Sequence, residues 1–216
     1  MDRTLVVKGI GKVSVPPDLT VISISITSLS RQYGEAMSAS YKQIEDVRAA
    51  LADVGFIKSD LKTTDFNVCS RYENERDQDG NYRNVFKGFE VNHSFKLEFG
   101  FNTDKLNDVL TVLAKCEAHP RLSVEFSVKD KYAVSEELLV SAVEDAAKRA
   151  KILAKASNVK LGEILNIDYG RKDLRLVSPT AYRADERCLA AKHTVLDIQP
   201  DNVDAADTVT VVWEIM

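Results

Sequence analysis

A glycine-rich segment near the start of the chain is the first candidate for chemistry. Gly9-Ile10-Gly11-Lys12-Val13-Ser14 begins like the fingerprint that binds a dinucleotide. That fingerprint needs a third glycine and a following helix, whose free N–H groups hold the pyrophosphate. Here Ser14 takes the third glycine position, and Pro16-Pro17 stand where the helix must begin. The segment therefore predicts a glycine-rich bend between strands, and we expect no cofactor.

Carboxylates and histidines are the next candidates, as metal ligands. Glu75, Asp77 and Asp79 resemble the first half of a calcium loop, but Phe86 stands where the closing bidentate glutamate is needed. The histidines are His93, His119 and His193, and the chain contains no His-x-Glu, His-Glu-x-x-His or Cys-x-x-Cys spacing. We expect a solvated hairpin tip at 73–84 and no bound metal.

The three cysteines, Cys69, Cys116 and Cys188, are candidate nucleophiles or disulfide partners. An odd number at wide spacing does not indicate a disulfide framework, so we expect free thiols. No nucleophile signature surrounds Cys69, and a nucleophile needs an adjacent base. We therefore expect no enzymatic activity, and a hydrolase that uses Cys69 or His193 is the less favoured alternative.

The composition is that of an ordinary globular protein of 216 residues, with 44% hydrophobic and 29% charged residues. A net charge of −4 disfavours nucleic acid and anionic membranes as partners. No apolar stretch has the length of a membrane-spanning helix, and Met1-Asp2-Arg3 does not begin a signal peptide. We expect a cytoplasmic protein as the chain stands. The alternative, if a signal peptide was removed, is a periplasmic or outer-membrane-associated protein.

Hydrophobic periodicity predicts the elements that must position these residues. Alternation predicts strands, and apolar positions three and four apart predict helices. The predicted strands are 5–7, 19–29, 61–72, 85–101, 122–128, 159–169 and 203–215, and the predicted helices are 34–54, 104–117 and 135–157. Residues 171–200 are expected to form a long loop. An alanine stripe from Ala142 to Ala154 should let the third helix approach its neighbour closely.

These elements predict a single α+β domain over residues 1–216, with long amphipathic helices packed on a mixed β-sheet. A shift of 102 positions aligns two β-α-β modules, at about 19–101 and 122–216, which leaves internal duplication open. Each crossover should be right-handed, so its flanking strands run parallel if they share a sheet. The strands around 73–84 predict a protruding hairpin.

Several motifs together resemble the SIMPL-domain family. They include Gly9-Ile10-Gly11, Val15-Pro16-Pro17-Asp18, Gly55-Phe56, Gly88-Phe89, Val124-Glu125-Phe126-Ser127, Lys148-Arg149-Ala150 and Ile198-Gln199-Pro200. The family usually has Pro-Gly where this chain has Pro200-Asp201. The resemblance implies an α+β fold, no established catalytic residues and a tendency to form ring- or channel-like homo-oligomers. Relatives include exported bacterial antigens and an animal protein that binds a pelle-like kinase in inflammatory signalling.

We therefore expect a non-enzymatic, self-assembling interaction protein, which the resemblance links to envelope or oxidative stress or to signalling. Its partners would be itself and an unidentified protein. The alternative is a small-molecule binder with a pocket between sheet and helix. The hairpin strands are longer than typical strands, and unpaired edges invite pairing. The expected oligomer contacts are Tyr72, Tyr82, Phe86 and Phe89.

Overall fold

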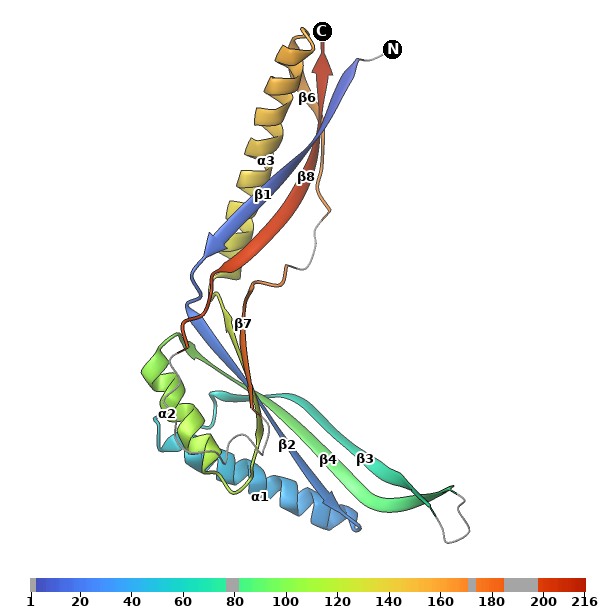
Figure 1. Cartoon of the computed structure of the whole chain (residues 1–216), viewed down its shortest axis with the longest axis vertical. Helices are drawn as coiled ribbons and strands as arrows, with labels where there is room; N and C mark the ends of the chain where they lie inside the picture. Colours follow the sequence, from blue (N-terminus) through green and yellow to red (C-terminus); the bar gives the residue numbers. More distant parts are fainter. Residues whose placement is uncertain (1–2, 77–81, 171–173, 185–197) are drawn as a thin grey trace. The chain divides into compact units, whose positions relative to one another are not determined.

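A computed structural model of the chain describes residues 3–76, 82–170, 174–184 and 198–216. In this part of the chain the elements follow one another as β1 (Thr4–Val15), β2 (Leu19–Ser30), α1 (Tyr33–Ala52), β3 (Leu61–Arg76), β4 (Tyr82–Gly100), α2 (Thr103–Ala114), β5 (Arg121–Ser127), α3 (Lys131–Ala156), β6 (Leu161–Asp168), β7 (Val177–Ala184) and β8 (Val203–Ile215) (Figure 1). The predicted α+β class is confirmed.

The chain divides into two compact units. The first, here the three-stranded unit, consists of Met1–Asp18, Ser127–Pro179 and Pro200–Met216. The second, here the five-stranded unit, consists of Leu19–Phe126 and Thr180–Gln199. This division differs from the modules expected at 19–101 and 122–216. Strand β5 belongs to the five-stranded sheet and β6 to the three-stranded sheet, so the second expected module contributes to both units.

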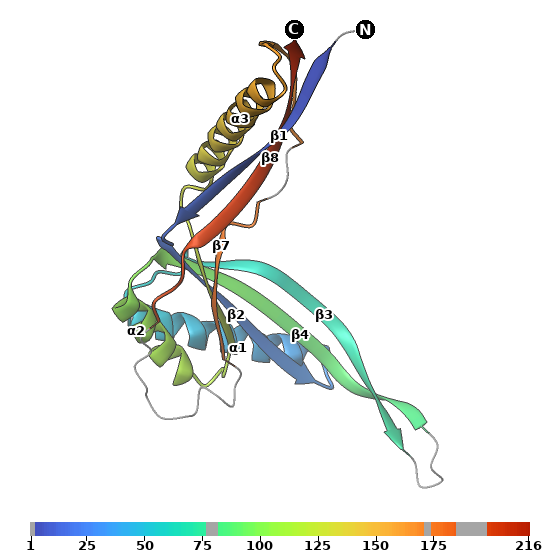
Figure 2. The ribbon, with the colours of Figure 1, turned by 45° about the horizontal axis from the view of Figure 1, so that its top comes forward.

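The three-stranded unit is an antiparallel sheet in the order β1-β8-β6 with α3 along one face (Figures 1 and 2). Alternate residues of β8 point toward α3, as its alternating sequence predicts. Val209, Val211 and Trp213 pack there against the buried alanines of α3. Ala142, Ala146, Ala150 and Ala154 are all buried, which confirms the close approach that the alanine stripe predicted.

Gly9 and Gly11 do not bend the chain, and the prediction of a bend was wrong. Strand β1 runs through both glycines in continuous register with β8. A Cβ atom at Gly9 would lie 2.0 Å from the carbonyl oxygen of Ala142, and one at Gly11 would lie 2.1 Å from that of Leu138. The glycines are therefore needed for the close contact of β1 with α3, where no side chain fits.

The five-stranded unit has the strand order β3-β4-β2-β5-β7, with α1 and α2 on one face (Figure 1). Its core contains Ile22, Ile24 and Ile26 of β2 together with apolar residues of β4, β5 and both helices. Strands β2 and β3 are each antiparallel to β4, so they run parallel to each other with β4 between them. The α1 crossover thus joins parallel strands as predicted, but the expected single mixed sheet is replaced by two sheets with antiparallel neighbours.

Strand β7 lies within residues 171–200, and the prediction of a long loop over this whole segment was wrong. Pro179 lies within β7, although proline cannot donate a backbone hydrogen bond. Strand β7 is at the edge of its sheet, where proline is tolerated. The position of a strand in its sheet, rather than its local sequence, decides whether proline fits.

Candidate interaction surface

The hairpin formed by β3 and β4 extends past the neighbouring strand. The last residue of β2, Ser30, pairs with Phe89, so residues 82–88 of β4 and 71–76 of β3 continue as a two-stranded ribbon. We refer to these two segments as the hairpin arm (Figures 1 and 2). Both strands reach further into the polar tip predicted at 73–84 than expected, and residues 77–81 of that tip lie outside the described residues.

A β-bulge at Gly88 sets which side chains share a face of the arm. Arg71 pairs with Gly88 and Tyr72 with Phe86, so Lys87 is an extra residue on β4. Gly88 has a φ of 145°, and a Cβ there would lie 2.3 Å from the carbonyl oxygen of Ser30. An extra residue reverses the alternation of a strand. The bulge therefore lets Phe86 and Phe89, three positions apart, contact each other.

Four aromatic side chains form a continuous cluster that runs from the arm to the start of α1. The ring centroids of Tyr72 and Phe86 are 5.4 Å apart, those of Phe86 and Phe89 5.5 Å, and those of Phe89 and Tyr33 5.7 Å, all in edge-to-face geometry. We refer to Tyr33, Tyr72, Phe86 and Phe89 as the aromatic cluster. Tyr72 is 54% exposed and Phe86 36%. The cluster is therefore a partly uncovered apolar surface.

Three of the four residues expected as oligomer contacts, Tyr72, Phe86 and Phe89, belong to this cluster. The fourth, Tyr82, pairs with Arg76 further out on the arm and is 74% exposed. Tyr33, the first residue of α1, was not among the expected contacts. Its place beside Phe89 depends on the pairing of Ser30 with Phe89, which no local pattern reveals.

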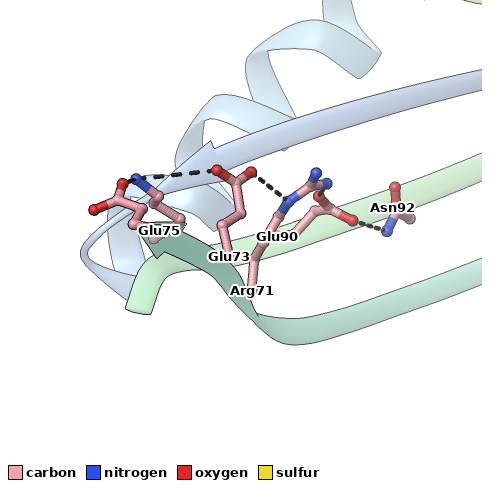
Figure 3. A network of polar contacts seen from close by, with 6 residues as sticks. Arg71, Glu73, Glu75, Glu90 and Asn92 are labelled. Atoms are coloured by element: carbon pink, nitrogen blue, oxygen red, sulfur yellow. Dashed lines mark hydrogen bonds and ion pairs between the residues drawn. The ribbon is translucent and has the colours of Figure 1, made fainter. Parts of the chain in front are cut away.

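The other face of the arm carries a network of charged side chains (Figure 3). Neighbouring residues of a strand point to opposite faces, so Arg71, Glu73 and Glu75 lie across the ribbon from Tyr72. The guanidinium of Arg71 donates a hydrogen bond to the carboxylate of Glu90 and forms an ion pair with it. The Nε of Arg71 lies 3.3 Å from Oε1 of Glu73 (Figure 3). Asn92 Nδ2 donates to Glu90 Oε1 at 2.9 Å.

These contacts favour the charged forms of Glu90 and Arg71. The hydrogen bond from Asn92, followed by that from Arg71, lowers the pKa of Glu90 below its ordinary value. The hydrogen bond to Glu90 raises the pKa of Arg71 further above its already high value. Exposed ion pairs add little to stability individually. The network instead fixes the positions of charges on the arm.

Cys69 and His93 do not form a catalytic pair. His93 lies on the helix-covered face, with its ring centroid 4.8 Å from Phe66 and 4.1 Å from Phe95, and its Nε2 is 3.2 Å from Thr63 Oγ1. His93 therefore lies among apolar side chains, where burial and then Arg48 lower its pKa. Cys69 pairs with Glu90, three residues from His93 and on the opposite face, so the two cannot act as nucleophile and base.

Some of the predicted positions lie outside the described residues: Asp77, Asp79, Cys188 and His193. Cys69 is exposed, Cys116 is buried, and both thiols are free. Over residues 3–76, 82–170, 174–184 and 198–216, no group of three histidine, cysteine or acidic side chains is placed to hold a metal ion. Within the same residues, no helix has the length and apolar character needed to cross a membrane.

A family model named SIMPL and described as "Protein of unknown function (DUF541)" matches residues 5–213. The chain belongs to the SIMPL family. Two relatives of this SIMPL protein are named "26 kDa periplasmic immunogenic protein": one from Brucella melitensis is 26% identical and one from Brucella abortus is 25% identical, each over 165 residues. Each alignment covers 76% of this chain and 65% of the relative, so the chain spans slightly less than two thirds of their length.

One solved structure, the regulatory subunit of aspartate kinase from Thermus flavus, is 10% identical over 97% of this chain and 90% of that one. Its TM-score of 0.17 is too low to indicate a shared fold.

Proposed function

We propose that this SIMPL protein is a non-enzymatic, self-assembling interaction protein, and that the hairpin arm is its contact surface. The single observation that carries the proposal is the partly exposed aromatic cluster beside β3, the outer strand of its sheet, whose far edge pairs with no other strand among the described residues. Aromatic side chains are enriched at protein interfaces, and an unpaired strand edge offers backbone groups to a second strand.

The charges of the arm favour a second copy of the chain as the occupant of this edge. An antiparallel pairing of two β3 edges centred on Tyr72 places Arg71 opposite the partner's Glu73, and Glu73 opposite the partner's Arg71. Opposite charges on directly paired residues stabilise a sheet. Because the pairing is two-fold symmetric, each contact occurs twice, as in most homodimer interfaces.

The test compares masses in solution by light scattering at micromolar concentration. The parent should exceed the 24.0 kDa of one chain. Tyr72→Ser/Phe86→Ser should approach 24.0 kDa, and a variant with Arg71–Phe86 replaced by an Asn-Gly turn should approach the mass of its own, shorter single chain. Tyr41→Ser, which removes an exposed tyrosine of α1, is the matched control and should assemble like the parent.

The outcomes separate self-assembly from the role of the arm. A monomeric parent would refute self-assembly. Equal assembly of parent and turn variant would refute the role of the arm. Glu73→Arg tests the register, because it places Arg71 opposite an arginine of the partner and should weaken assembly more at low salt than at high salt.

We also propose a periplasmic location, the alternative expected from the sequence. The printed names of the two Brucella relatives support it. Fractionation of the native host, followed by immunodetection of the chain, should find it in the periplasmic fraction. Detection in the cytoplasmic fraction alone would refute this location.

A further inference from the structure

The free edge of β1 is covered by side chains of α3. In an antiparallel pair, a residue directs both its N–H and its C=O either toward the partner strand or away from it. Arg3 faces β8, because its carbonyl oxygen accepts the N–H of Ile215 at 3.0 Å. The direction repeats every second residue, so the backbone N–H and C=O groups of the odd-numbered residues of β1 point toward β8. The N–H groups of Ile10 and Lys12 therefore point to the free edge.

Both of these edge-facing N–H groups have acceptors on α3. The N–H of Ile10 donates to Asp145 Oδ2 at 2.8 Å, and the N–H of Lys12 donates to Ser141 Oγ at 3.4 Å. The Nε of Arg149 is 2.8 Å from the same Asp145 oxygen and holds the carboxylate in place. The backbone hydrogen bond from Ile10 and then that from Arg149 keep the pKa of Asp145 below its ordinary value.

The sequence of β1 is adapted to this contact. Gly9 and Gly11 flank Ile10, and a Cβ at either position would collide with the backbone of α3. A helix carrying Asp145 and Ser141 can reach the strand edge only because both side chains are absent. Lys12 and Lys8 add charge to the same strand, a second device that discourages strand pairing.

We infer that α3 carries an autoinhibitory contact, in which Asp145 and Ser141 occupy the edge-facing N–H groups of β1 and close the three-stranded sheet to an added strand. The excluded partner is strand β8 of a second copy of the chain. It would otherwise pair with the outer edge of β1, opposite the edge that pairs with β8 of the same chain. Strand addition needs these N–H groups, so it requires α3 to release them. This inference does not depend on the hairpin arm, which lies in the other unit.

The experiment uses the full chain and a labelled peptide with the sequence of residues 203–215, the natural partner of β1. Asp145→Ala/Ser141→Ala should bind the peptide, seen as a rise in fluorescence anisotropy, and its Ile10 and Lys12 amides should exchange about tenfold faster. Asp145→Asn keeps an acceptor oxygen, and Glu144→Ala removes only a neighbouring carboxylate. Both controls should behave like the parent. The binding should persist when Tyr72→Ser/Phe86→Ser is added, which separates it from assembly through the arm.

Two results would overturn the inference. One is equal peptide binding by the parent and the double variant. The other is unchanged amide exchange in a folded double variant. If the double variant does not fold, the parent decides the question: its Ile10 and Lys12 amides should exchange more slowly than those of Val6 and Lys8 on the same edge, and equal rates would refute the contact.

Discussion

Replacing Gly9 with alanine should destabilise the three-stranded unit by about 3 kcal/mol, at the upper end of the range for overpacking. The added Cβ would lie 2.0 Å from the carbonyl oxygen of Ala142, which is 1.4 Å inside the 3.4 Å where ordinary contact begins. It would also lie 2.6 Å from the amide nitrogen of Ala146. Both atoms belong to the helix backbone, so no side-chain rotation relieves the collision and α3 must move as a whole.

The fluorescence of Trp213 reports this change directly. Trp213 is the single tryptophan of the chain, and it is buried in the cluster formed with Ala142, Ala146 and Ala150. In urea, a loss of about 3 kcal/mol with a slope of about 1.5 kcal/mol/M lowers the unfolding midpoint by about 2 M. The matched control is Gly170→Ala in the same unit, where a Cβ meets nothing within 4 Å. Its free energy of unfolding should stay within about 1 kcal/mol of the parent.

A midpoint shared by Gly9→Ala, Gly170→Ala and the parent would refute this prediction. Such a result would mean that α3 is not held against β1 in solution. A lowered midpoint in both variants would show that loss of glycine itself, rather than the collision with α3, is the cause.

Two further predictions concern titratable groups. The ring of His93 should titrate below 6.5, because burial and then Arg48 disfavour its charged form. The unfolded chain then takes up the proton first, so the free energy of unfolding should fall as pH drops through about 6.5. It should level off once the folded ring is also protonated. NMR titration of the ring checks this, and a midpoint above 6.5 would contradict it. A thiol reagent should label Cys69 quickly and Cys116 slowly in the folded protein, since Cys116 is buried and burial raises its pKa. The unfolded, unreduced chain should show three free thiols, and a single one would indicate a disulfide.

The sequence alone determined the elements that depend on local periodicity. The stripe from Ala36 to Leu51 predicted α1, and the alternation from Val203 to Ile215 predicted β8, because one buried face imposes a period of 3.6 or 2 on neighbouring residues. The same patterns predicted the α+β class and placed Tyr72, Phe86 and Phe89 on a long hairpin. These aromatic residues lie on the two strands of a single hairpin, within one short stretch of sequence, so they could be found without a structure.

Only the tertiary structure decided which strands share a sheet and what the glycines do. Thr4 pairs with Glu214, and the N–H of Ile10 reaches Asp145, across more than a hundred residues. Periodicity shows that one face of an element is buried, but not which element covers it. Gly9 was therefore interpreted as a bend, and the contact of Tyr33 with Phe89 was not predicted. Gly88 shows the same limit, because its bulge follows from the close passage of Ser30 and not from its neighbours in sequence. Contacts between distant segments are selected by mutual fit in three dimensions, which no local pattern of residue types records.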